Sequence, residues 1–419
     1  MLASFLPLSF SVIHAQDASS WTIFIYLEAT DNLCDMAIKN LTDLALADSD
    51  SRITFIAQVH AFSDKAIRYK IEHKKLIPLE YITLTTSDKQ NFIDANIWAF
   101  SNYKSAKNML VIWNHGWGIL EPVWNSMQKA WCLEPDLVHE ISCETCSTRK
   151  HLDQSCTERV HDIQHRGFLS NAHTHTMLSN NDLTDALAQV TDQLPHKQFD
   201  IIGFDTCMGA QLEISYQLVP YARYQIGCQN CELKDGWDYG ALGTHITPKM
   251  AAHELVQVII NTYHEYYQKE TRQETYTISA IDLSQIYKLC GQLELVINRL
   301  VELCKNESEL KKIIIETRLV SPGFCFIPMY TDLYAFCAQL ADRLNTYQED
   351  RLQALTQELY KLRKLAQEVI IANKTGTQMH DKAHGISIYF PVNHIDSSYF
   401  QALFAQKTLW ITFLKEIIA

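Results

Sequence analysis

Short apolar runs rich in β-branched and aromatic residues recur along the chain, and they constrain its fold more than any other feature. They are continuous rather than strictly alternating, which is typical of strands covered on both faces. The runs are WTIFIYL (21–27), ITFIAQV (53–59), NMLVIWN (108–114), FDIIGF (199–204), TYTISAI (275–281) and GISIYF (385–390). We therefore expect a sheet buried between two layers of other structure.

Helical patterns lie between these runs. NDLTDALAQVTDQL (181–194) follows Ser179 and Asn180, and either residue could cap its first turn. From Leu352 to Val369, apolar residues repeat every three or four positions and form one stripe on a long helix. Strands that alternate with helices predict an α/β fold, a three-layer α/β/α sandwich with a mainly parallel sheet.

The chain reads as one large domain over residues 16–419 of its 419 residues. A helical block at about 283–373 precedes the last apolar run, so we interpret this block as an insertion or layer on the same domain. Residues 121–178 differ from the rest because they are polar, rich in Cys and His, and without a sustained period. Long irregular stretches of this kind are typically functional or flexible.

Composition excludes some classes of partner. The chain has 47% hydrophobic and 20% charged residues, as ordinary globular proteins do, and a net charge of −12. This acidic balance argues against nucleic acid or an anionic membrane as the main partner.

Residues 1–15 are mostly apolar and end at Ile13-His14-Ala15, a small-residue cleavage site, so we predict a signal peptide. The alternative is a mature N-terminal strand or tail. No other stretch is long and apolar enough to predict a membrane span. A secreted or periplasmic protein is the expectation.

Two of the apolar runs end in residues with reactive or donor groups. NMLVIWN leads into Asn114-His115-Gly116, and FDIIGF leads into Asp205-Thr206-Cys207. In parallel sheets, ligands bind outside the carboxyl ends of the strands. Two neighbouring strand ends would therefore bring the imidazole of His115 and the thiol of Cys207 into one crevice.

This pairing favours nucleophilic catalysis over a structural role. A thiolate can attack a carbonyl carbon while a histidine protonates the leaving amine. Gly116 adds an unobstructed backbone N–H where an oxyanion-binding donor is required. The alternatives are a buried space-filling thiol at Cys207 and a structural histidine at His115.

With these residues in place, the sequence resembles the clostripain family in the caspase–hemoglobinase clan of cysteine peptidases. The opening strand WTIFIYLEATDNL and the nucleophile segment DIIGFDTCMGAQLEISYQL, with Glu213 six residues after the cysteine, carry the resemblance. Further blocks follow in the expected order: DGWDY (235–239), TISAIDLS (277–284), YTDLYAF (330–336) and HGISIYFP (384–391).

The resemblance implies a caspase-like fold and a cysteine endopeptidase that cleaves polypeptides after Arg or Lys. It implies that Cys207 is the nucleophile, that His115 is its partner, and that Gly116 and Cys207 form the oxyanion hole. A basic substrate side chain needs a buried carboxylate, and the resemblance assigns this role to Asp205 and Asp235. The alternatives are a turn or helix-capping aspartate at Asp205 and a plain turn at Asp235.

Two further properties follow from the resemblance alone. Self-cleavage in the loop after His115 is expected near Arg149 and Lys150, with an ordinary flexible insertion as the alternative. Calcium binding is expected only by resemblance, since the sequence has no EF-hand-like acidic loop. The chemistry itself requires no cofactor.

The Cys/His-rich stretch leaves several interpretations open. Cys132, Cys143, Cys146 and Cys156 could form disulfides, hold zinc or remain free thiols. A zinc-dependent hydrolase lacks support because no H-E-x-x-H motif is present. The main rival to a peptidase is a catalytically silent secreted binding protein on the same scaffold.

Overall fold

The architecture is built on one nine-stranded sheet. The computed structural model describes residues 19–30, 33–62, 64–125, 130–132, 169, 176–271, 274–305, 307–325 and 327–418. The strand order is β13-β10-β9-β8-β5-β1-β2-β3-β4. In that order the strands span Ile370–Thr375, Thr277–Asp282, Ala222–Gly227, Phe199–Asp205, Ser105–Trp113, Ser19–Glu28, Ile53–Phe62, Lys65–Glu72 and Lys75–Thr83.

Parallel pairing occupies the centre of this sheet. β9, β8, β5, β1 and β2 pair with one another in parallel. The edges are antiparallel, with β10 and β13 on one side and β3 and β4 on the other. The predicted α/β fold is confirmed, with parallel order confined to the central strands. At the β4 edge the order is antiparallel because β2, β3 and β4 follow one another as hairpins.

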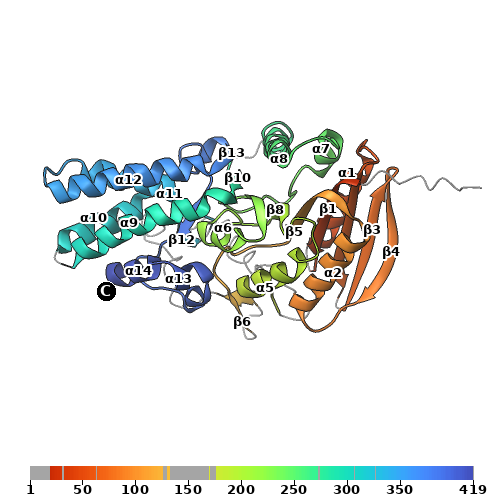
Figure 1. The fold of residues 1–419 in the computed structure, drawn as a ribbon, viewed down its shortest axis with the longest axis horizontal. Coiled ribbons are helices and arrows are strands. Elements are labelled where there is room, and N and C mark those ends of the chain that lie inside the picture. Colours follow the sequence, from red (N-terminus) through yellow and green to blue (C-terminus); the bar gives the residue numbers. More distant parts are fainter. Residues whose placement is uncertain are drawn as a thin grey trace, which may run out of the picture.

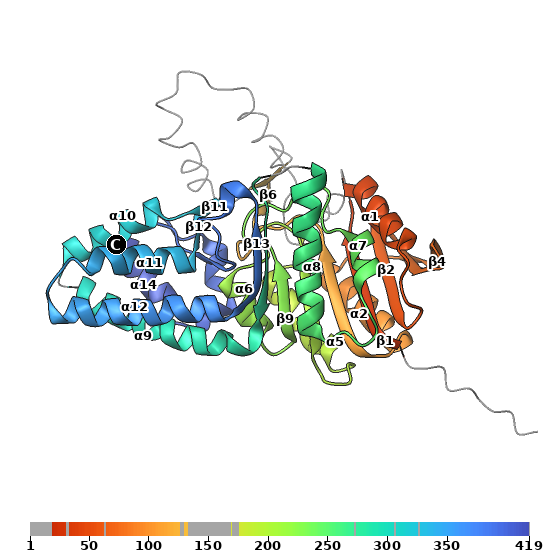
Figure 2. The same ribbon diagram turned by 90° about the horizontal axis from the view of Figure 1, so that it is seen from above.

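Helices cover both faces of the sheet, as predicted (Figure 2). One face carries α1 (Cys34–Leu46), α7 (Tyr239–His245) and α8 (Ala252–Tyr266), and the other carries α2 (Asp88–Asn102), α5 (Asn180–Thr191) and α6 (Leu212–Leu218). In β1, Ile23 and Ile25 join the core on the α1 side, whereas Phe24 and Tyr26 join the core on the α2 side. Because alternate side chains point to opposite faces, a strand between two cores must be apolar throughout.

A helical lobe extends beyond the β13 edge (Figures 1 and 2). It contains α9 (Ile286–Cys304), α10 (Ser308–Val320), α11 (Leu333–Leu344), α12 (Asp350–Glu368), α13 (Leu403–Lys407) and α14 (Trp410–Ile418). The predicted stripe is present on α12, where Leu352, Leu355, Leu359 and Leu362 are buried. The same region holds a small sheet of β11 (Gly323–Phe324), β12 (Ile327–Asp332) and β14 (Ser387–Tyr389).

The last predicted strand belongs to this small sheet rather than to the large one. β14 pairs with β12 and covers only part of the run 385–390. Within 121–178 the structure describes a hairpin of β6 (Val123–Asn125) and β7 (Ala130–Cys132). The proposed signal peptide, the Arg149-Lys150 site and Cys143, Cys146 and Cys156 lie outside the described residues. Among the helices of the described part, none has the length and apolar character needed to cross a membrane.

Glu213, in α6, forms hydrogen bonds with the C-terminal region. Its Oε1 accepts hydrogen bonds from the Tyr389 N–H at 2.9 Å and the Tyr399 hydroxyl at 3.1 Å. Burial raises the pKa of this carboxyl from 4.5 to about 7. Between pH 4.5 and about pH 7, the native state therefore binds up to one proton more than the unfolded state, and the free energy of unfolding decreases as pH rises.

We expect the Glu213→Gln variant to lose less stability than the wild type between pH 5 and pH 7.5. The difference is about 2 kcal/mol, because glutamine removes the cost of ionising a buried carboxyl. Urea unfolding at the two pH values measures it. The exposed Glu309→Gln is the matched control and should keep the wild-type pH dependence. Parallel wild-type and Glu213→Gln curves would show that Glu213 does not titrate in this way.

Candidate functional site

Strand register brings the two predicted catalytic residues to one edge of the sheet. β5 pairs with β8 so that Trp113 lies opposite Asp205, and the Asn114 N–H reaches the Asp205 carbonyl at 3.4 Å. His115 and Cys207 each stand two residues beyond this last pair. The structure thus places both at the carboxyl end of adjacent parallel strands, where the sequence predicts them.

The backbone at Gly116 packs directly on the nucleophile segment. A Cβ at this position would collide with the Cys207 carbonyl oxygen and lie 2.8 Å from the Thr206 Oγ1. Only a residue without a side chain allows the chain after His115 to approach this closely. The close approach places the candidate oxyanion donors, the Gly116 and Cys207 amides, on adjoining segments; their role stays a prediction.

Cys207 lies in a tight turn between β8 and α6 and is 5% exposed. Met208 follows with a φ of 55°, and its N–H donates to the Asn230 carbonyl at 3.0 Å. The Glu232 N–H donates to the Cys207 Sγ at 3.2 Å. The segment 230–232 therefore holds both the turn and the sulfur.

Asp205 precedes Cys207 by two residues, and its side chain is buried. Its Oδ2 accepts from the Tyr239 hydroxyl at 2.8 Å and from the Trp237 N–H at 3.2 Å. Its Oδ1 is buried and accepts no hydrogen bond from the described residues. Gly236, with a φ of 66°, leaves room for this carboxyl, because a Cβ there would lie 2.8 Å from Oδ2. Burial raises the Asp205 pKa to about 7.

Glu232 is a second acid at this site and was not predicted from the sequence. Its Oε1 accepts from the Tyr263 hydroxyl at 2.6 Å, while its Oε2 is buried without a partner in the described part of the chain. Burial, and then the charge of Asp205, raise the Glu232 pKa well above its usual value. The two carboxyls interact, so ionisation of one makes ionisation of the other harder. The segment CELKDGW contains two acids, but nothing in its spacing distinguishes Glu232.

Asp235 lies at the margin of the same acidic group. Its Oδ2 accepts from the Tyr266 hydroxyl at 2.7 Å, and its side chain is only half-buried. The Tyr267 hydroxyl donates to the Gly236 carbonyl at 2.8 Å, and burial, followed by the charges of Glu232, Asp205 and Asp235, raises the pKa of Tyr267. The structure thus places Glu232, rather than Asp235, in interaction with Asp205, and Asp235 follows in the same loop.

A disulfide between Cys231 and Cys325 lies beside Cys207. It joins the loop after β9 to the turn between β11 and β12, which are 94 positions apart in sequence. The sulfurs of Cys207, Cys231 and Cys325 form the one cluster of three potential metal-ligating side chains of His, Cys, Asp or Glu among the described residues. Calcium takes oxygen ligands, so this cluster does not fit the calcium that the resemblance implies.

We expect Gly116→Ala to slow alkylation of Cys207 by iodoacetamide about tenfold, because the added methyl group displaces the His115 segment from the nucleophile. Gly291→Ala is the matched control, since a Cβ there meets nothing within 4 Å. Alkylation is followed by mass spectrometry of the Cys207 peptide, and thermal unfolding confirms that both variants fold. Equal alkylation rates in the two variants would contradict the close approach of Gly116 to Cys207.

Comparison with solved structures supports the architecture. The chain is similar to a secreted C11 cysteine protease from Bacteroides thetaiotaomicron bound to an irreversible peptide inhibitor, with 16% identity and a TM-score of 0.60; the match covers 94% of this chain and 99% of that one. It is also similar to an inactive zymogen C11 protease from Parabacteroides distasonis, with 15% identity, a TM-score of 0.58 and coverage of 95% and 98%. At these identities the likeness establishes the fold.

Sequence comparison establishes the family. No curated protein matches the chain. The model of the clostripain family, peptidase family C11, matches residues 158–416, which is more than half of the chain. The matched region contains Asp205, Cys207 and Asp235 and begins after His115. The chain therefore belongs to the clostripain family.

Proposed function

We propose that this protein is a cysteine endopeptidase that cleaves polypeptides after Arg or Lys, with Cys207 as nucleophile and His115 as its catalytic partner. The register of β5 and β8, which brings these residues to one sheet edge beside a buried acidic group, is the observation that carries the proposal. Family membership supports a cysteine peptidase. The secreted relative of similar structure supports export of the chain.

In the proposed reaction, the Cys207 sulfur attacks the scissile carbonyl carbon and His115 protonates the departing amine. Negative charge develops on the carbonyl oxygen as the tetrahedral intermediate forms. The backbone N–H groups of Gly116 and Cys207 stabilise this charge. Water then hydrolyses the acyl-enzyme, with His115 accepting a proton from it.

Preference for basic residues rests on the acids below Cys207. Asp205 Oδ1 and Glu232 Oε2 are both buried without a hydrogen-bond donor among the described residues. An unpaired buried carboxylate is costly, whereas a guanidinium or ammonium group that enters the site supplies donors and opposite charge. A substrate with Asp before the cleaved bond would instead place like charges together.

The first test compares amide substrates that end in Arg, Lys or Asp. We expect the wild type to hydrolyse the Arg and Lys substrates, and Cys207→Ala and His115→Ala each to reduce kcat by at least about a thousandfold, because each removes a group that acts in the transition state. Reducing conditions and added calcium are included. Absence of wild-type turnover on all three would favour a silent binding protein on this scaffold.

The second test uses pH. We expect Cys207→Ala to bind a peptide ending in arginine amide more weakly as pH falls below about 7, because protonation of Asp205 removes the charge that pairs with the guanidinium. The loss approaches tenfold per pH unit. Isothermal calorimetry measures it, and binding near neutral pH should release a proton because the ligand cation favours ionised carboxyls.

Asp205→Asn supplies the comparison for this experiment. In the Cys207→Ala background it should weaken binding of the arginine peptide and flatten the remaining pH dependence. The norleucine counterpart of the peptide is the ligand control, since it carries no charge to pair. If the arginine peptide binds equally at pH 5.5 and pH 8, Asp205 does not recognise the basic side chain.

A further inference from the structure

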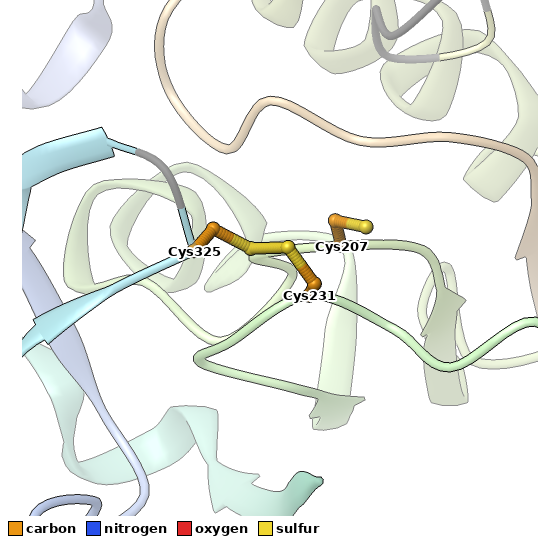
Figure 3. Close-up of side chains that lie close together, drawn as sticks. All are labelled: Cys207, Cys231 and Cys325. Atoms are coloured by element: carbon orange, nitrogen blue, oxygen red, sulfur yellow. A yellow bond between two sulfur atoms is a disulfide. The ribbon is translucent and has the colours of Figure 1, made fainter. Parts of the chain in front are cut away.

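Three sulfur atoms from three separate segments meet at the candidate active site. The Sγ atoms of Cys207, Cys231 and Cys325 all lie within 4.8 Å of one another (Figure 3). Cys231 and Cys325 are joined as a disulfide, whereas Cys207 has no disulfide. In Figure 3 the Cys231 end of the disulfide lies on the side of Cys207.

Backbone contacts hold this cluster together. The Glu232 N–H that binds the Cys207 sulfur belongs to the residue directly after Cys231. Asn230, directly before Cys231, accepts the Met208 N–H through its carbonyl and the Cys325 N–H through its Oδ1 at 2.7 Å. One three-residue segment thus contacts both the Cys207 turn and the Cys325 turn, and these bonds hold the backbones that carry the three sulfurs close together.

Proximity of a thiol to a disulfide permits exchange without any added oxidant. A thiolate attacks one sulfur of a disulfide and displaces the other as the leaving thiolate. Holding the two groups in one site makes this an intramolecular step, which gives a high effective concentration. In Figure 3 the Cys207 sulfur points away from the disulfide, so attack requires rotation about the Cys207 Cα–Cβ bond.

We propose that the Cys207 thiol exchanges reversibly with the neighbouring Cys231–Cys325 disulfide. The resulting Cys207–Cys231 bond masks the nucleophile. The Cys207 thiol loses its proton to a base or to water, and its sulfur bonds to the Cys231 sulfur. The Cys231–Cys325 bond breaks, the electron pair leaves on the Cys325 sulfur, and that thiolate takes a proton from water. The number of disulfides is unchanged, and no external oxidant or reductant is consumed.

The product differs from the starting state in two measurable ways. Cys207 can no longer attack a substrate, and the half-buried Cys325 becomes a free thiol. Small thiol reductants would cleave the new bond and restore the nucleophile. The effect on activity rests on the proposed role of Cys207, whereas the exchange itself does not depend on it.

Mass spectrometry of the wild-type protein tests the exchange directly. The oxidised protein is incubated at pH 8 without reductant, treated with N-ethylmaleimide, and digested with pepsin at acidic pH, where disulfides do not rearrange. We expect Cys207–Cys231 linked peptides together with alkylated Cys325. The Cys207→Ala variant is the control and should show only the Cys231–Cys325 link. The proposal would be overturned if the wild-type digest showed the same linkage and the same Cys325 labelling as the Cys207→Ala digest.

Peptidase activity provides the second measurement. Dithiothreitol should raise wild-type activity severalfold and leave the Cys231→Ser, Cys325→Ser double variant unchanged, because that variant has no disulfide to exchange. An equal gain in both proteins would overturn the proposal. Circular dichroism checks that the double variant folds. If the double variant does not fold, the linkage of the wild-type peptides tests the proposal on its own. If the wild type cleaves no substrate, the proposed function fails while the peptide linkage still tests the exchange.

Discussion

The parallel pairing of β5 with β8 is the constraint on which the rest of the site depends. It places Trp113 opposite Asp205 and so carries the two chain segments off the sheet side by side. His115 and Cys207 then stand at equivalent positions beyond their strands. Gly116 allows the segments to remain in close contact, because a side chain there would overlap the Cys207 backbone.

The electrostatics of the site follow from how deeply it is enclosed. The carboxyl groups of Asp205 and Glu232 are removed from water, and each accepts few hydrogen bonds. Burial therefore raises both pKa values, and the charge of either group opposes ionisation of the other. An apolar substrate side chain would leave these groups unsatisfied. A cationic one would compensate them, which links the shape of the loop 230–239 to the proposed preference for Arg and Lys.

The same loop connects the acidic group with the sulfur chemistry. Asn230 binds the Met208 and Cys325 backbones, and Cys231 forms the disulfide. Glu232 donates its amide to the Cys207 sulfur, and its carboxyl interacts with Asp205. Consecutive residues thus serve structure, covalent cross-linking and the proposed recognition of a basic side chain. The disulfide is therefore linked to Cys207 through the contacts of Asn230 and Glu232.

The strands β1, β2, β5 and β8 and the two strand-end motifs could be read from the sequence alone, whereas the parallel strand β9 was missed. Residues such as Phe24 and Ile25 face opposite cores, and burial on both sides leaves a continuous apolar run that is recognisable without a structure. The edge strands β3, β4 and β13 were missed because one side is partly exposed, and their sequences mix charged with apolar residues. His115, Gly116, Asp205 and Cys207 were found because each follows a strong strand signal.

The acid that faces Asp205 and the cysteines that lie beside Cys207 could be identified only from tertiary contacts. Glu232 lies in a loop without periodicity, and its position depends on contacts with Cys207 and Tyr263 from other elements. Cys325 is 94 positions from Cys231, and no spacing rule predicts that pairing. Local sequence patterns report burial along a strand or helix, whereas these sites arise from the packing of distant loops.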